Sequence, residues 1–154
     1  MKIYADTNFF TRLYLQLGDT PAALALLDKS ERKTFGSIPI TWLLRLELTN
    51  AIQFHVFAGR SGQIRVTPEQ AAIATATFHQ DLLDDDLFCK TPVSMEELEK
   101  SFTELSLRHT AKHGFRTYDL LHVASALMLE CDTFWSFDPK ANKLAKLEGL
   151  RIRS

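Results

Sequence analysis

The sequence predicts an α/β fold in which a central parallel sheet is covered by helices on both faces. Short strand-like runs alternate with longer helical segments along the 154 residues. No two of these runs are joined by a two-residue turn, so we expect helical crossovers between parallel strands rather than hairpins. With 45% apolar residues and a net charge of −1, the composition is typical of one globular domain spanning residues 1–154.

In the first half of the chain, capping residues separate the expected helices from the expected strands. Thr20 precedes a proline, as at many helix starts, and Thr41 is expected to cap a long helix. Residues 67–70 have the sequence Thr-Pro-Glu-Gln, a capping-box pattern. The pattern predicts strands at 2–5 and 36–40, helices at 9–17, 22–33, 42–58 and 68–84, and a surface connection at 60–63.

The second half repeats the alternation of strand and helix. Ser94 opens another capping-box pattern, Gly114 follows that helix, and Thr117 is expected to cap the next one. The pattern predicts strands at 87–91, 132–137 and 150–153 and helices at 95–113, 118–130 and 139–148.

Composition excludes several classes of protein. The sequence has no apolar run of the length that a membrane span requires, so we expect no membrane association and a cytoplasmic location. Cys89 and Cys131 lack the spacing of a zinc site and are expected to be reduced and packed. With 18 basic and 19 acidic residues there is no large positive field, so any nucleic-acid role depends on a local site.

Two aspartates come directly after predicted strands. Asp6 follows the first strand and Asp138 follows the fourth. Because parallel strands end at one edge of a sheet, both carboxylates should project at that edge. Two carboxylates placed in this way favour a bound cation, although each could simply cap the helix that follows it.

Glu47 lies on or beside the apolar stripe of its helix. Its neighbours three and four positions away include Leu44 and Ala51, whereas Arg45 points elsewhere. An unpaired carboxylate in an apolar setting is costly, so we expect a cation partner. That partner could be a metal ion or, in a purely structural ion pair, a basic side chain.

Asp119 is expected in the first turn of a helix that is apolar almost all round and therefore buried. An acid there complements the helix dipole, but a buried carboxylate charge is costly unless it has a partner. His122 lies three residues on, on the same face, where it could donate a hydrogen bond to a carboxylate or serve only as a core histidine. Together, Asp6, Glu47, Asp119 and Asp138 favour a Mg²⁺ or Mn²⁺ site, because such ions take oxygen ligands.

The four acids also lie in short motifs whose order along the chain is informative. Asp6-Thr7-Asn8 follows the first strand, and Glu47 lies in Leu-Arg-Leu-Glu-Leu. Asp119 lies in Arg-Thr-Tyr-Asp-Leu-Leu-His, and Ser136-Phe137-Asp138 precedes a closing helix and strand. Over essentially the whole chain this order resembles the PIN domain nucleases, most closely the VapC-like toxins of toxin–antitoxin pairs. The resemblance implies a three-layer α/β/α sandwich with a central parallel sheet.

The resemblance also implies an activity and partners. It implies a metal-dependent ribonuclease that cleaves RNA by in-line attack, leaving a 5′-phosphate and a 3′-hydroxyl, with the four acids as ligands of Mg²⁺ or Mn²⁺. It implies a homodimer and a small antitoxin that covers the acids. The further roles expected are orientation of the site by Asn8 and Ser136, contact with substrate phosphates by Arg116 and Lys140, and a hydrogen bond from His122.

The first two predicted helices carry more apolar side chains than one helix stripe normally buries. We expect this surplus to form a groove for an amphipathic partner helix. The side chains concerned are Phe9, Phe10, Leu13, Tyr14, Leu17, Leu24, Leu26 and Leu27.

One departure from the family pattern and two alternative functions remain open. Lys140 and Asn142 stand where many PIN domains carry a further acid, so one firmly held cation is expected, with a second recruited by substrate. A phosphatase of the haloacid-dehalogenase type would use Asp6 as nucleophile, but such enzymes usually carry an acid where this chain has Asn8. The other alternative is a non-catalytic PIN-like interaction module in which the acids form ion pairs.

Overall fold

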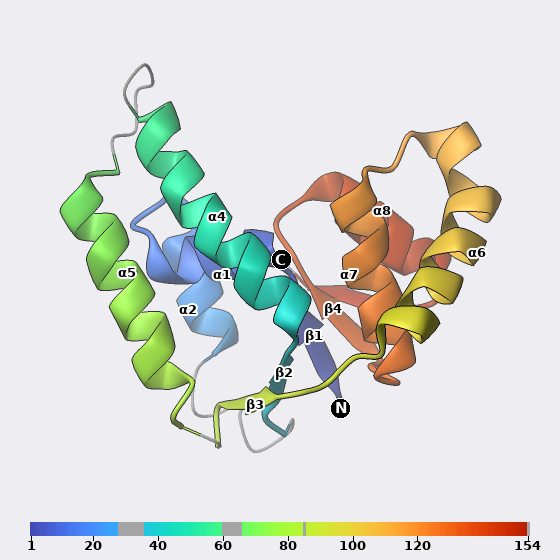
Figure 1. The fold of residues 1–154 in the computed structure, drawn as a ribbon, viewed down its shortest axis with the longest axis horizontal. Coiled ribbons are helices and arrows are strands. Elements are labelled where there is room, and N and C mark those ends of the chain that lie inside the picture. The colour runs from blue at the N-terminus through green and yellow to red at the C-terminus, as the bar shows by residue number, and fades with distance from the viewer. Residues whose placement is uncertain (28–35, 60–65, 85, 154) are drawn as a thin grey trace.

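Parallel strands form the centre of the molecule. The computed structural model describes residues 1–27, 36–59, 66–84 and 86–153 (Figure 1). The predicted helix end at 33 and the predicted connection at 60–63 lie outside these ranges. All the described strand pairs are parallel, in two hydrogen-bonded groups, β1-β4-β5 and β2-β3. The strands are β1 (Ile3–Ala5), β2 (Ile38–Ile40), β3 (Phe88–Lys90), β4 (Thr133–Trp135) and β5 (Arg151–Arg153).

Helices cover both faces of the strands, as the sequence predicts. In Figure 1 α1, α2, α4 and α5 lie on one side and α6, α7 and α8 on the other. The helices are α1 (Thr7–Tyr14), α2 (Thr20–Leu26), α4 (Trp42–Ala58), α5 (Pro68–Asp81), α6 (Met95–His113), α7 (Thr117–Met128) and α8 (Pro139–Leu147).

Side chains along β1 and β4 point alternately to the two faces of the sheet, and so contribute to two separate cores. Ile3, Ala5 and Trp135 belong to the cluster formed with α1, α4 and α5, whereas Tyr4 and Phe134 belong to the cluster formed with α6, α7 and α8. Successive side chains of a strand point to opposite faces, so each short strand contributes to both cores. The predicted α/β class with a parallel sheet and helices on both faces is confirmed.

Most predicted helix starts are confirmed by their caps. The side chains of Thr41, Thr67 and Ser94 each accept a backbone hydrogen bond from the first turn of the following helix. Two starts differ. The Thr20 hydroxyl donates to the Arg12 and Leu15 carbonyls, so it ties down the preceding turn and α2 begins at Thr20 itself.

The other difference is at the start of α7. Thr117 is already helical and Arg116 occupies the cap position, where its backbone N–H donates to the Asp119 carboxylate. The predicted cap at Thr117 is therefore wrong by one residue, because the helix already includes Thr117 and Asp119 in its first turn accepts the backbone N–H of the cap residue Arg116.

The apolar surplus of the first two helices is used mainly in the core. Phe9 and Phe10 are fully buried, and their rings pack edge to face with centroids 5.4 Å apart. The partly buried side chains that pack against this cluster are Leu13, Tyr14, Leu17, Leu26 and Leu27. Leu24 is 54% exposed. Phe9 and Phe10 are therefore core residues and take no part in the expected partner groove, which stays a prediction for the partly buried and exposed side chains.

Two smaller predictions concern cysteines and membranes. Cys89 and Cys131 are both free thiols, but only Cys131 is packed, since Cys89 lies exposed on β3. Within the described ranges, every helix is too short or too polar to cross a bilayer.

Candidate metal centre

Asp6 sits at the point where β1 passes into α1. Its Oδ1 accepts the Phe9 N–H at 2.9 Å, and its Oδ2 accepts the Ser136 hydroxyl at 2.6 Å. The residue is 4% exposed. Burial raises the pKa of the Asp6 carboxyl to about 6, although the charge of His122 and these two hydrogen bonds act in the opposite direction. Asp6 is therefore a buried carboxylate whose charge is only partly compensated.

Asp138 caps α8 as Asp6 caps α1, but it lies two residues further from its strand, since β4 ends at Trp135. Its Oδ1 accepts the backbone N–H of Lys140 at 2.7 Å and of Ala141 at 3.4 Å, which caps α8. The Ser136 hydroxyl accepts the Asp138 N–H at 2.9 Å while donating to Asp6. Ser136 thus joins the two aspartates that follow neighbouring strands.

Asn8 and Lys140 have defined positions beside these aspartates. Asn8 Oδ1 accepts the Phe137 N–H at 3.1 Å and so ties the segment after β4 to α1. Lys140 Nζ donates to the Gly114 carbonyl at 3.0 Å, at the junction between α6 and α7. Lys140 therefore lies beside Asp138 in the chain, but its ammonium group is directed to this junction.

Glu47 is held by side chains from α1 and α7. Its Oε2 accepts hydrogen bonds from the Thr7 hydroxyl and from His122 Nε2, and His122 Nδ1 bonds the Tyr4 hydroxyl at 2.8 Å. Burial acts to raise the pKa of Glu47, but the hydrogen bond and charge of His122 and the bond from Thr7 outweigh it, so the pKa is lowered. Glu47 is thus the carboxylate to which His122 is bonded.

Asp119 and Asp138 share one basic partner. Arg116 donates through its backbone N–H to Asp119 Oδ2 at 3.1 Å, and its guanidinium lies 3.6 Å from the same oxygen. The same guanidinium bonds Asp138 Oδ2 at 2.9 Å. The pKa of Asp119 is nevertheless raised, chiefly by burial and also by the charge of Asp138.

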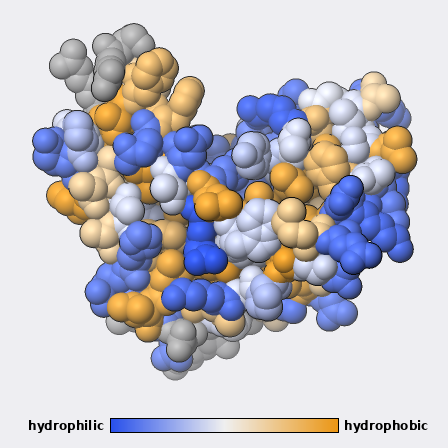
Figure 2. All heavy atoms as spheres, in the orientation of Figure 1, coloured by the Kyte–Doolittle hydropathy of each residue, from blue (hydrophilic) through white to orange (hydrophobic). Residues whose placement is uncertain are grey.

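The four predicted acids line one cavity of about 410 Å³. They come from four different elements, since Asp6 and Asp138 cap α1 and α8 while Glu47 and Asp119 lie on α4 and α7. In the space-filling view the surface is hollowed between the half that contains α4 and the half that contains α7 and α8 (Figure 2). The remaining lining residues are Thr7, Asn8, Thr11, Arg12, Ala51, Phe54, His55, Arg116, Tyr118 and His122.

The donor chemistry of this cavity fits a hard divalent cation, although the acids are not yet gathered around one point. Among the described residues, no three His, Cys, Asp or Glu side chains stand close enough to hold a metal ion together. Within the same ranges Glu47 Oε1 and Asp119 Oδ1 accept no hydrogen bond, because the described partners all use the other oxygen. Oxygen ligands are thus available, and Arg116 occupies part of the space between two of them.

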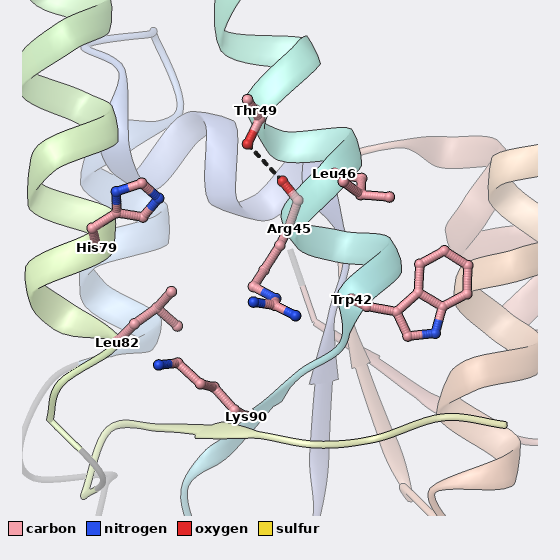
Figure 3. A pocket seen from close by; sticks show the side chains of 7 residues that line it. All are labelled: Trp42, Arg45, Leu46, Thr49, His79, Leu82 and Lys90. Carbon is pink, nitrogen blue, oxygen red and sulfur yellow. Dashed lines mark hydrogen bonds between the residues drawn. The ribbon is translucent and has the colours of Figure 1, made fainter.

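A second hollow, of about 490 Å³, lies between α4 and α5 (Figure 3). It is larger than the acid-lined cavity, but no carboxylate lines it. Arg45 and Lys90 both extend into the region that it occupies. The complete lining is Trp42, Arg45, Leu46, Thr49, His79, Leu82 and Lys90. Size therefore does not identify the functional site here, because a basic hollow cannot supply the oxygen ligands of a metal.

Comparison with known proteins identifies the fold. No protein-family model matches the sequence, and no curated protein is matched at a significant level. Among solved structures, VapC20 from Mycobacterium tuberculosis, a toxin that cleaves the sarcin–ricin loop, has a TM-score of 0.67 at 16% identity and covers 99% of this chain and 100% of its own. VapBC2 from Rickettsia felis, bound to a fragment of its promoter DNA, has a TM-score of 0.63 at 17% identity, with 99% and 98% covered. PAE2754 from Pyrobaculum aerophilum has a TM-score of 0.53 at 18% identity, with 99% and 90% covered.

These structural neighbours show to which class of fold the chain belongs. The chain has a PIN-type α/β fold that extends over essentially its whole length. Within that class, the solved structures that resemble it include VapC toxins, so the fold is VapC-like. At this level of identity the likeness concerns the fold, and the chemistry has to be argued from the residues of the cavity.

Several cavity residues were not assigned a role from the sequence. Thr7 lies inside the Asp-Thr-Asn motif, yet its bond to Glu47 depends on the packing of α1 against α4. The sequence does contain a signal for Phe54, because its spacing of seven residues from Glu47 places both side chains on the same helix face. Tyr118 precedes Asp119 in the first turn of α7 and also lines the cavity. Helical spacing counted from Glu47 would have found Phe54, whereas for Tyr118 the only signal is that it directly precedes Asp119.

Proposed function

We propose that this chain is a metal-dependent endoribonuclease of the VapC kind, acting as a single domain in the cytoplasm. The observation that carries the proposal is that carboxylates from four elements line one cavity in a VapC-like PIN fold. Asp6, Glu47, Asp119 and Asp138 would hold Mg²⁺ or Mn²⁺ there. A divalent cation at this site would activate water and stabilise negative charge on a phosphodiester.

The surrounding residues support the proposed site in different ways. Ser136 keeps Asp6 and Asp138 in a fixed relation, and Asn8 anchors the segment that carries Asp138. His122 and Thr7 direct Glu47 through one oxygen and leave the other free of described bonds. Buried ligands held in this way cost little reorganisation when a cation arrives.

Basic groups at the cavity would meet the substrate. Arg116 lines the cavity and is 66% exposed, so it can turn from the acids to a phosphate. Lys140 is exposed beside Asp138 and is a second candidate for phosphate contact. With Arg116 displaced from Asp119 and Asp138, both carboxylates become available to the metal.

A cleavage assay tests the proposal. The purified protein should cut single-stranded RNA with Mg²⁺ or Mn²⁺, lose that activity in EDTA, and regain it when the metal is restored. Asp119→Asn should abolish cleavage while circular dichroism shows an intact fold. Undiminished cleavage in EDTA, or in Asp119→Asn, would overturn the metal-dependent mechanism.

We further propose that a small antitoxin binds this chain and that the chain forms a homodimer. The R. felis neighbour is a VapBC2 assembly, which supports an antitoxin partner by analogy of fold. An antitoxin side chain carrying Arg or Lys could take the position of Arg116 between the acids. Co-expression with the product of an adjacent small open reading frame, followed by chromatography with light scattering, would detect both assemblies; a monomer that ignores that product would contradict them.

A second candidate function is a non-catalytic PIN-like module. The ion pairs of Arg116 with Asp119 and Asp138 favour it, because they neutralise two of the four acids without a metal. A Mn²⁺ titration separates the two functions. A nuclease should bind Mn²⁺ and lose affinity for it in Asp119→Asn, whereas a non-catalytic module should show neither effect. A phosphatase using Asp6 as nucleophile is disfavoured, because Asn8 stands where such enzymes usually carry an acid and its Oδ1 accepts the Phe137 N–H.

A further inference from the structure

Two large aromatic side chains line the acid cavity but remain exposed. Phe54 on α4 is 62% exposed and Tyr118 on α7 is 51% exposed. Neither belongs to the two buried clusters that α4 and α7 help to form. Exposed aromatic rings that gather at one site are typical of binding surfaces, because isolated rings of this size are usually packed.

Their positions relate both rings to the acids. Phe54 follows Glu47 by seven residues on α4, so it lies two turns along the same helix face. Tyr118 directly precedes Asp119 in the first turn of α7. The two rings therefore reach the cavity from two different helices, each from beside a different acid.

Basic groups complete the chemistry of this surface. Arg12 and Arg116 line the same cavity. Arg12 lies 3.2 Å from Asp19 and its guanidinium carbon is 5.7 Å from the centre of the Phe137 ring. Guanidinium groups bind phosphates, and exposed rings stack on bases. The cavity thus combines groups for a metal, for a phosphate backbone and for flat apolar rings.

We infer that Phe54 and Tyr118 stack on the unpaired bases that flank the phosphate to be cleaved, and so position the substrate in the cavity. The inference rests on the proposed nuclease function and assigns two residues that hold its substrate. Bases in a duplex are already stacked on their neighbours and cannot lie against a ring on a cavity wall. An unpaired segment can turn its bases outward onto the aromatic rings while its phosphates meet Arg12 and Arg116.

α4 provides a matched pair of variants for the test. Phe57 is also an exposed ring, at 64%, and its centroid is 6.0 Å from that of Phe54, but it does not line the cavity. Phe54→Leu and Phe57→Leu therefore make the same chemical change at nearly equal exposure on one helix. Leucine is a good helix former, so both variants should keep the fold.

The experiment measures affinity for a labelled single-stranded RNA and for the same sequence as a duplex, by fluorescence anisotropy. Ca²⁺ replaces Mg²⁺ in the binding assay, because it takes the same kind of oxygen ligands. Phe54→Leu and Tyr118→Leu should each weaken binding of the single strand roughly tenfold, the size of effect expected for loss of one stacked base. Phe54→Trp and Tyr118→Phe should retain wild-type affinity, as should Phe57→Leu.

Cleavage in Mg²⁺ is measured in parallel to separate the two hypotheses. If the wild type cleaves RNA but Phe54→Leu and Phe57→Leu bind alike, the stacking inference is overturned and the nuclease function stands. Equal weakening for single-stranded and duplex RNA would also overturn it. If the wild type neither cleaves nor binds RNA with either cation, the nuclease function fails and the inference fails with it.

Discussion

The two faces of α4 differ sharply although their residues are close in sequence. Glu47 and Arg45 are two residues apart, which places them about 200° apart around the helix axis. Glu47 faces the cavity lined by three further acids, whereas Arg45 faces the hollow between α4 and α5 (Figure 3). One helix thus contributes a carboxylate to one site and a guanidinium to another.

The difference lies in how each charge is held. Glu47 is bonded by Thr7 and His122, which come from α1 and α7, and it is partly buried. Neither Arg45 nor Lys90 forms an ion pair with any residue of the described ranges. A buried charge that several elements position is costly to maintain, whereas an exposed charge costs little. These differences favour the Glu47 face as the place of the proposed chemistry, although the hollow on the other face is no smaller.

The largest expected effect comes from comparing one substitution on each of these two faces of α4. Glu47→Gln removes a charged ligand but keeps the shape of the side chain, so RNA cleavage should fall at least roughly a hundredfold, beyond the usual effect of altering a residue that only supports a ligand. Arg45→Gln should leave the cleavage rate within about twofold, since single exposed charges contribute little. Initial rates with Mg²⁺ at fixed RNA concentration provide the measurement. Equal losses in both variants would show that the basic hollow takes part in the reaction.

The next effect concerns the cost of burying Asp6. Without metal, Asp6→Asn should hold or raise the free energy of unfolding by about 1 kcal/mol, because it removes a buried, partly compensated charge and asparagine caps helices as well as aspartate does. With metal at a hundred times its dissociation constant, the wild type should gain about 2.7 kcal/mol and the variant much less.

Thermal melts with EDTA and with Mn²⁺ measure both halves of this prediction. The order of the two melting temperatures should reverse between the two conditions. Arg45→Gln is the control, because it lies on the other face of α4 and should respond to Mn²⁺ as the wild type does. An Asp6→Asn variant that melts below the wild type even in EDTA would indicate that Asp6 has a structural role instead.

Much of the fold could be predicted because its signals are local. Alternating apolar runs located all five described strands, and Thr41, Thr67 and Ser94 marked helix starts that the structure confirms. The cap at Thr117 failed because α7 begins at Thr117 itself and Asp119, inside the helix, accepts the N–H of the cap residue Arg116. Phe9 and Phe10 were wrongly included in the partner groove, because helical spacing shows that side chains share a face but not what that face packs against.

The candidate site was predictable to the level of which acids line the same cavity. Strand ends and helix faces were enough to bring Asp6, Glu47, Asp119 and Asp138 to one cavity. The bonds that hold them were not predictable, since Ser136 reaches Asp6 across 130 residues of sequence. Such contacts depend on the register of β1 against β4 and leave no local trace.

A smaller effect is expected from changing a residue that supports the acids but is not itself a metal ligand. Ser136→Ala removes the hydroxyl that joins Asp6 to the Asp138 backbone and should weaken Mn²⁺ binding by about 10- to 100-fold. Ser125→Ala is the matched control, because Ser125 is equally buried but donates to the Leu121 carbonyl within α7. Isothermal titration with Mn²⁺ distinguishes them. Similar affinities for the two variants would mean that the Ser136 bridge does not organise the metal ligands.

The smallest effect comes from Arg116, which lies between Asp119 and Asp138. Arg116 and Arg151 are both 66% exposed and each pairs with an aspartate, at 2.9 Å to Asp138 and 2.7 Å to Asp132. Each Arg→Ala change should alter the free energy of unfolding by less than about 1 kcal/mol, as exposed pairs do. Only Arg116→Ala should also tighten Mn²⁺ binding, because it removes a cation that competes for the oxygens of Asp119 and Asp138, and weaken RNA binding, because it removes a phosphate contact. Titration with Mn²⁺ and anisotropy with RNA measure these opposite shifts, and a variant in which both affinities fall would show that Arg116 supports the carboxylates rather than competing for them.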